Sequence, residues 1–158
     1  MSKFSLIAMG GTFDIIHHGH ITLLSTAFDI SEKVIIGLTS DEFVQKKGKN
    51  PIHKYDERLK NLTSIIFKKF PNSYFEISQL NNDFGPAVFE KELQALVVSD
   101  ETKNQGNILN KLRIERNLSP VEIIVVPMTL AKDGKRISTT RIKNSEIDSD
   151  GNLLPIDN

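Results

Sequence analysis

Two histidines three residues apart carry the clearest chemical signal in the sequence. Residues 10–20 read GGTFDIIHHGH, which places His17 and His20 on one face of a helix expected to begin near His17. Imidazoles at a helix N-terminus can donate hydrogen bonds to phosphate oxygens, and the backbone amides of the first turn favour the same anion. Gly10 and Gly11 allow backbone amides to approach a bound group closely. The segment therefore predicts a phosphate-binding site.

Two other interpretations of this segment remain open. Asp14, His17 or His18, and His20 could instead be metal ligands, or the segment could be a glycine-rich turn with surface histidines. Neither GxGxxG nor GxxxxGK[ST] is present, so the dinucleotide fingerprint and the P-loop are both excluded. Because the whole string directly follows a strand-like apolar run, phosphate chemistry is favoured over both alternatives.

A second group of polar side chains lies near the C-terminus. Residues 133–142 read DGKRISTTRI, with three successive hydroxyls followed by a guanidinium: Ser138, Thr139, Thr140 and Arg141. Ser138 or Thr139 could cap a helix. The same four side chains could also hold a phosphate tail through hydroxyls, amides and the guanidinium.

The apolar pattern predicts the elements that would position these segments. Continuous runs rich in β-branched residues are typical of strands buried on both faces; they occupy residues 4–9, 34–38, 96–98 and 121–126. The more alternating residues 74–80 are expected nearer a sheet edge. Helical spacing follows from His20 onward and in residues 54–70 and 106–118. This alternation predicts an α/β, Rossmann-like doubly wound parallel sheet, with ligands beyond the carboxyl ends of its strands.

The overall composition excludes several classes of protein. The 158 residues suit one domain, and the zero net charge lacks the basic excess of a nucleic-acid binder. The absence of cysteine excludes a disulfide framework, a cysteine zinc site and a thiol nucleophile. Apolar runs are too short for a signal peptide or a membrane span. We therefore expect a cytoplasmic protein without nucleic-acid or membrane partners, either monomeric or homo-oligomeric.

Both polar segments resemble signatures of the HxGH nucleotidyltransferase superfamily. Residues 10–20 resemble its GTFDxxHxGH motif, and residues 133–142 resemble its ISSTxxR-type motif. Thr139 and Thr140 stand where serine is frequent, and Arg141 comes earlier than the basic residue of many relatives. The likeness implies a nucleotidyltransferase domain over residues 1–148, followed by a C-terminal tail at residues 149–158.

The resemblance extends over roughly residues 3–148 to the archaeal and eukaryotic type of phosphopantetheine adenylyltransferase. It is carried by residues 37–42, the lysines at 46, 47 and 49, and residues 55–58, 83–86 and 97–102. Where the bacterial type has an RGLR-like run, residues 99–102 read SDET. The family implies ATP, with Mg²⁺, and 4′-phosphopantetheine as substrates, and dephospho-coenzyme A and pyrophosphate as products.

The resemblance also implies a role for each candidate residue. The catalytic group comprises His20, His17 and Thr12. The ATP-binding group comprises Gly10, Gly11, Thr12, Phe13, His17, His20, Ser138, Thr139, Thr140 and Arg141. Lys47, with Thr12, would bind the acceptor phosphate, and no side chain is expected to be a dedicated metal ligand. Apart from the resemblance, Arg58 and Arg113 are expected to support the structure or the rim of the site, and the rings of Phe13 and Tyr55 to lie in the core.

Other functions share these motifs. Glycerol-phosphate cytidylyltransferases and nicotinamide-nucleotide and FAD adenylyltransferases differ in acceptor or base. A non-catalytic nucleotide sensor on the same fold is the alternative from another class.

Overall fold

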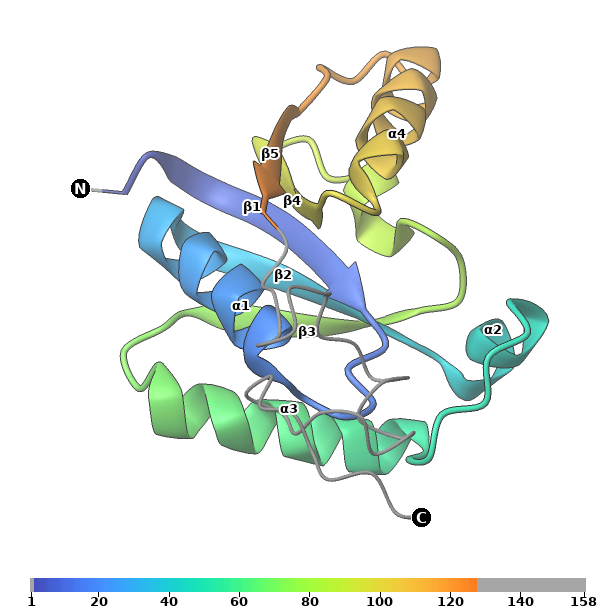
Figure 1. Cartoon of the computed structure of the whole chain (residues 1–158). Coiled ribbons are helices and arrows are strands. Elements are labelled where there is room, and N and C mark those ends of the chain that lie inside the picture. The colour runs from blue at the N-terminus through green and yellow to red at the C-terminus, as the bar shows by residue number, and fades with distance from the viewer. Residues whose placement is uncertain (1, 128–158) are drawn as a thin grey trace.

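The computed structural model describes residues 2–127, which form a parallel sheet with helices on both faces (Figure 1). Its strands are β1 (Phe4–Gly11), β2 (Ser31–Thr39), β3 (Phe75–Leu80), β4 (Ala95–Ser99) and β5 (Glu122–Val126). Its helices are α1 (His18–Ile30), α2 (Asp41–Lys46), α3 (Tyr55–Lys69), the 3₁₀ helix η1 (Gly85–Val88) and α4 (Lys103–Glu115). The segment at residues 133–142 and the expected domain boundary at residue 148 lie outside the described residues.

The strand order β3-β2-β1-β4-β5 confirms the predicted doubly wound sheet. The chain begins at the centre with β1, adds β2 and β3 on one side, and then crosses to β4 and β5 on the other. The order therefore reverses between β1 and β4, and sheets of this kind bind ligands beyond the carboxyl ends of the strands at that point. The predicted phosphate segment directly follows β1.

Alternating side chains of the strands divide the core into two layers. On one face, Ile7 and Ile36 pack with Leu24 of α1 and Leu62 of α3. On the other face, Ala8, Ile35 and Leu96 pack with Leu109 of α4 and with residues of η1. Figure 1 shows α1 and α3 together on one side of the sheet and α4 on the other. Both faces of β1 and β2 are thus covered, which explains their continuous apolar runs.

Several element boundaries differ from the predicted ones; the second strand, for example, was expected at residues 34–38 and runs from Ser31 to Thr39. The first strand was expected to end at Met9, but β1 continues through Gly10 and Gly11, which pair with Gly37 and Leu38. Gly37 leaves room for the Leu80 side chain, because a Cβ atom at residue 37 would lie 2.6 Å from Leu80 Cδ1. The last predicted helix begins three residues earlier than expected and ends at Glu115, shortly before the left-handed Asn117 at φ 61°.

The short helix α2 was not predicted. Its start is fixed locally, because Ser40 accepts a hydrogen bond from the Phe43 amide through Oγ at 3.1 Å. Asp41 and Glu42 add negative charge to its first turn, which stabilises a helix N-terminus. The expected edge position of residues 74–80 is confirmed, since β3 has one neighbour in the described sheet. In residues 2–127, no helix combines the length and the apolar character needed to cross a bilayer.

Candidate active site

The N-terminus of α1 is built from the two histidines of the first motif. His17 is the N-cap residue, and its Nδ1 accepts a hydrogen bond from the Gly19 amide at 3.1 Å. His20 Nδ1 in turn accepts from the His17 amide at 3.1 Å. An Nδ1 atom that accepts a hydrogen bond carries no proton, so each neutral ring has its proton on Nε2. Both imidazoles are therefore held as Nε2–H donors.

The environment of His20 keeps its ring uncharged. The two imidazoles stack with a centroid separation of 3.9 Å, and the Phe13 ring lies 5.0 Å from that of His20. Burial, with a smaller contribution from His17, lowers the pKa of His20 from 6.5 to about 3. His20 is accordingly neutral at physiological pH, so it can donate a hydrogen bond but does not act as an imidazolium acid.

The loop between β1 and α1 contains an unusual backbone conformation. Phe13, and not a glycine, adopts the left-handed region at φ 50°, which is costly for a bulky side chain. The residue is 2% exposed and its ring belongs to the core, so the ring is not available to stack on a ligand. The preceding residue, Thr12, accepts a hydrogen bond from the Thr39 hydroxyl at 3.1 Å. The Thr12 hydroxyl keeps its own proton for donation.

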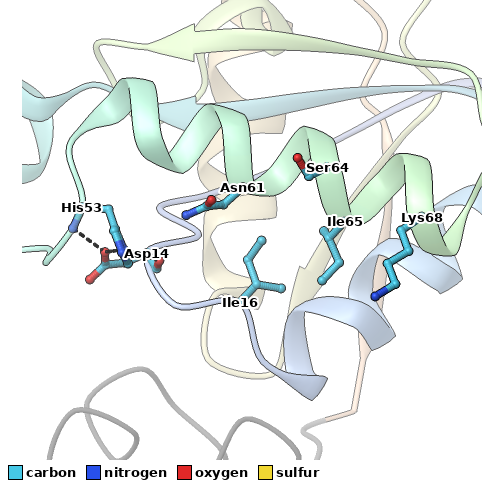
Figure 2. Close-up of a pocket in the computed structure, with 7 residues that line it drawn as sticks. All are labelled: Asp14, Ile16, His53, Asn61, Ser64, Ile65 and Lys68. Atoms are coloured by element: carbon cyan, nitrogen blue, oxygen red, sulfur yellow. Dashed lines mark hydrogen bonds and ion pairs between the residues drawn. The ribbon is translucent and has the colours of Figure 1, made fainter.

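Asp14 joins the loop to the segment before α3. Its Oδ2 accepts from the Ile52 amide and its Oδ1 from the His53 amide, both at 2.9 Å. The His53 ring adds contacts from Nδ1 to Asp14 O at 3.0 Å and Oδ1 at 3.1 Å, as Figure 2 shows. Asp14 is 5% exposed, and both carboxylate oxygens are already bound to backbone amides. This arrangement disfavours the interpretation of Asp14 as a metal ligand.

A pocket of about 340 Å³ opens beside this junction (Figure 2). It lies between the loop and α3 and is lined by Asp14, Ile16, His53, Asn61, Ser64, Ile65 and Lys68. Its lining includes neither Thr12 nor the two histidines of the motif. The pocket is therefore a neighbour of the predicted phosphate site and not the site itself.

Lys47 lies at the same edge of the sheet as the loop between β1 and α1, which is called the phosphate loop below. It is the C-cap of α2, which follows β2, and its Nζ forms an ion pair with Asp83 Oδ1 at 2.8 Å. Asp83 belongs to the loop after β3, and Lys47 Nζ also lies 4.6 Å from the centre of the Phe43 ring. Because β1, β2 and β3 are parallel, their carboxyl ends and the following loops share one edge.

The structure thus places each described candidate residue at or near one sheet edge. Gly10 and Gly11 end β1, Thr12 and Phe13 form the loop, and the histidines open α1. The remaining candidates, Ser138, Thr139, Thr140 and Arg141, lie outside the described residues. Three residues that contact or support the loop were not predicted to do so: Thr39, Asp41 and His53. Arg58 was expected to support the structure or the rim, but not this loop in particular. A sequence signal existed for Arg58, a charged residue on the apolar face of its helix, four residues before Leu62.

Comparison with known proteins agrees with this geometry. Residues 8–145 match the cytidylyltransferase-like family. The phosphopantetheine adenylyltransferase of Pyrococcus abyssi is 41% identical over 156 residues, which is 98% of each chain. That of Methanothermobacter thermautotrophicus is 40% identical over 96% of this chain and 91% of its own length.

The fold is also similar to that of a solved structure. A protein of unknown function from Archaeoglobus fulgidus superposes with a TM-score of 0.70 at 27% identity, covering 78% of this chain and 89% of that one. Sequence similarity over nearly the whole chain and structural similarity over most of it therefore agree. The chain belongs to the cytidylyltransferase-like family of HxGH nucleotidyltransferases and, within it, to the archaeal-type phosphopantetheine adenylyltransferases.

Proposed function

We propose that this enzyme transfers the adenylyl group of ATP to 4′-phosphopantetheine, giving dephospho-coenzyme A and pyrophosphate. The observation that carries this proposal is the pair of Nε2–H donors at the start of α1, in a chain 41% identical to a named adenylyltransferase over 98% of its length. The donors lie beyond the carboxyl end of β1, beside the point where the strand order reverses.

The reaction needs positioning more than acid–base chemistry. A phosphate oxygen of the acceptor, already ionised, forms a bond to the α-phosphorus of ATP, while the bond from that phosphorus to the β-phosphate oxygen breaks and pyrophosphate departs. No general base is required, so catalysis depends on alignment and on stabilisation of charge. In our proposal His20 donates Nε2–H to the α-phosphate, where charge builds in the transition state. His17 and Thr12 orient the same phosphate or the acceptor.

The triphosphate would be held by three further sets of groups. The backbone amides of the loop after Gly11, and those amides in the first turn of α1 that the histidine rings do not bind, suit phosphate oxygens. Outside the described residues, Ser138, Thr139, Thr140 and Arg141 are proposed to hold the β- and γ-phosphates.

Mg²⁺ is expected to bind together with the triphosphate. Within residues 2–127, no three His, Asp or Glu side chains are grouped to hold a metal ion. We propose that Mg²⁺ is coordinated mainly by phosphate oxygens and water, and we assign it no described side chain. When bound, the ion would neutralise part of the phosphate charge.

The function is tested by pyrophosphate release with different substrate pairs. We expect ATP with 4′-phosphopantetheine to give dephospho-coenzyme A, and the reverse reaction to proceed from dephospho-coenzyme A and pyrophosphate. CTP with glycerol phosphate, and ATP with nicotinamide mononucleotide or FMN, should turn over far more slowly. Faster turnover of any of these pairs would contradict the acceptor assignment. Tight ATP binding, with no pyrophosphate release for any acceptor, would instead favour the non-catalytic nucleotide sensor.

Lys47→Ala is expected to raise the KM for 4′-phosphopantetheine about 10-fold and to change that for ATP little. A charge-assisted hydrogen bond contributes about 1.5–3 kcal/mol, and the side chain is 41% exposed, so solvent screening favours the lower end of that range. In the free enzyme Asp83 holds the ammonium that the acceptor phosphate would take over. Lys46→Ala is the matched control. An unchanged acceptor KM for Lys47→Ala would remove Lys47 from the site and leave Lys46 and Lys49 as candidates.

A further inference from the structure

A fully buried guanidinium joins the loops around the candidate site. Arg58 of α3 is 0% exposed. Its Nη1 donates to Thr12 O at 3.0 Å and to Thr39 O at 2.8 Å, and its Nε donates to His53 O at 3.1 Å. Its Nη2 forms an ion pair with Asp41 Oδ1 at 2.9 Å. One side chain thus binds the loop after β1, the end of β2, the start of α2 and the segment before α3.

The bond to Thr12 fixes the peptide that precedes the strained residue. In a planar trans peptide, the carbonyl and the following N–H point in opposite directions. The Thr12 carbonyl points to Arg58, so the Phe13 amide is turned away from α3. The left-handed Phe13 backbone persists only where its surroundings enforce it, since such a conformation costs on the order of 1–3 kcal/mol. Two contacts hold it in place: the hydrogen bond from Arg58 to the Thr12 carbonyl, and the packing of the Phe13 ring in the core.

The bond to Asp41 connects the same guanidinium to the helix that ends at Lys47. Asp41 is the first residue of α2, and its Oδ1 also accepts from the Tyr55 amide at 2.9 Å. Asp41 thereby ties the start of α2 to the first turn of α3. Because α2 has only six residues, a shift of its start moves Lys47 with it. Arg58 therefore sets the position of α2 relative to the Thr12 loop.

We propose that Arg58 is a positioning residue for adenylyl transfer. It holds the phosphate loop and α2 at the spacing that aligns the α-phosphate of ATP with the acceptor phosphate, while touching neither substrate. This inference rests on the proposed function. It predicts that loss of the guanidinium lowers kcat more than it weakens the binding of either substrate, because a misplacement of about 1 Å can cost on the order of 100-fold in rate.

Arg113 provides a matched control. It is also 0% exposed, and it also binds backbone carbonyls: Nη1 donates to Ala87 O at 2.6 Å and Glu90 O at 2.8 Å, and Nε to Ser119 O at 2.9 Å. These carbonyls belong to η1, to the segment between η1 and β4 and to the segment before β5, and none of them belongs to the loop after β1, to the end of β2 or to α2. Its loss removes a buried guanidinium and its bonds to backbone carbonyls from the core without releasing the loop between β1 and α1.

The experiment compares Arg58→Lys with Arg113→Lys in the full chain. A single ammonium keeps the charge but cannot reach all the partners of a forked guanidinium. We expect Arg58→Lys to lower kcat at least 30-fold, on the order of a 1 Å misplacement, with threefold or smaller changes in both KM values. Arg113→Lys should reduce the melting temperature by a similar amount and keep kcat within about twofold, since it leaves the site geometry unchanged.

Hydrogen exchange supplies a readout that does not depend on turnover. The amides of residues 10–20 should exchange faster in Arg58→Lys and at the wild-type rate in Arg113→Lys. If the wild type makes no dephospho-coenzyme A, the proposed function fails, while the exchange comparison still decides whether Arg58 holds the loop.

The proposal is overturned if folded Arg58→Lys keeps kcat within about threefold, or if both variants lower kcat equally. If Arg58→Lys does not fold, Asp41→Ala takes its place, because it removes the Nη2 partner and leaves the Ser40 cap of α2 in place. We expect Asp41→Ala to lower kcat several-fold relative to Asp56→Ala, which removes a first-turn carboxylate from α3. Equal kcat values for these two variants would also overturn the proposal.

Discussion

His20→Asn is expected to lower turnover about 100- to 1000-fold while ATP affinity and melting temperature stay near their wild-type values. Removing one hydrogen-bond donor that stabilises the charge developing in the transition state usually lowers the rate by this factor. An asparagine oxygen can take the place of Nδ1 and accept from the His17 amide, but asparagine is too short to place a donor where Nε2–H lies. A contact made mainly in the transition state lowers the barrier without tightening ground-state binding, so the ATP dissociation constant should change little.

His20→Gln gives the complementary variant. Its amide nitrogen can approach the position of Nε2, but the side chain offers no acceptor at the position of Nδ1. We therefore expect His20→Gln to keep more turnover than His20→Asn and to lose more stability, since the His17 amide loses its partner at the helix start. Turnover, ATP dissociation constant and melting temperature should be measured on one preparation of each variant. A stable, ATP-binding His20→Asn enzyme with near-normal turnover would contradict the catalytic role of His20.

Acidification below pH 6.5 is expected to destabilise the wild-type protein through the same residue. The pKa of His20 is lowered to about 3 in the folded state, whereas an unfolded histidine titrates near 6.5. Between these values the unfolded chain binds a proton that the folded protein excludes, so the free energy of unfolding falls as pH falls. The contribution of His20 to the free energy of unfolding is fully present above about pH 6.5. It is lost progressively as the pH falls toward 3, and the total loss is on the order of a few kcal/mol.

The His20 contribution can be isolated by comparison with His20→Asn. Denaturant unfolding at several pH values between 7 and 4 should show a steeper loss of stability for the wild type than for the variant. Titration of groups that do not contact His20 is common to both proteins and cancels in the difference. Parallel pH profiles would show that His20 is not kept neutral by the fold. The same property predicts that His20 produces no acidic limb in kcat between pH 6 and 8.

The sequence by itself determined the order of the five strands and of the longer helices α1, α3 and α4, and it placed the predicted phosphate segment directly after the first strand. Buried strands are visible as continuous apolar runs because both faces of β1 and β2 are covered. The spacing of His17 and His20 sufficed to place both rings at one helix end, since a cap and its third residue face each other in any helix of this kind. These features are local, so a pattern within about ten residues specifies them.

Only the tertiary structure decided how the site is held and what state its groups are in. The bond from Arg58 to Thr12 spans 46 residues of sequence, and that from His53 to Asp14 spans 39. The low pKa of His20 arises from burial of its ring, which lies against Phe13 and His17, and the left-handed Phe13 backbone accompanies a ring fixed in the core. Spacing along a chain specifies which side chains share a helix face. It does not specify which distant carbonyl a buried guanidinium will meet, because that contact depends on how the layers pack against each other.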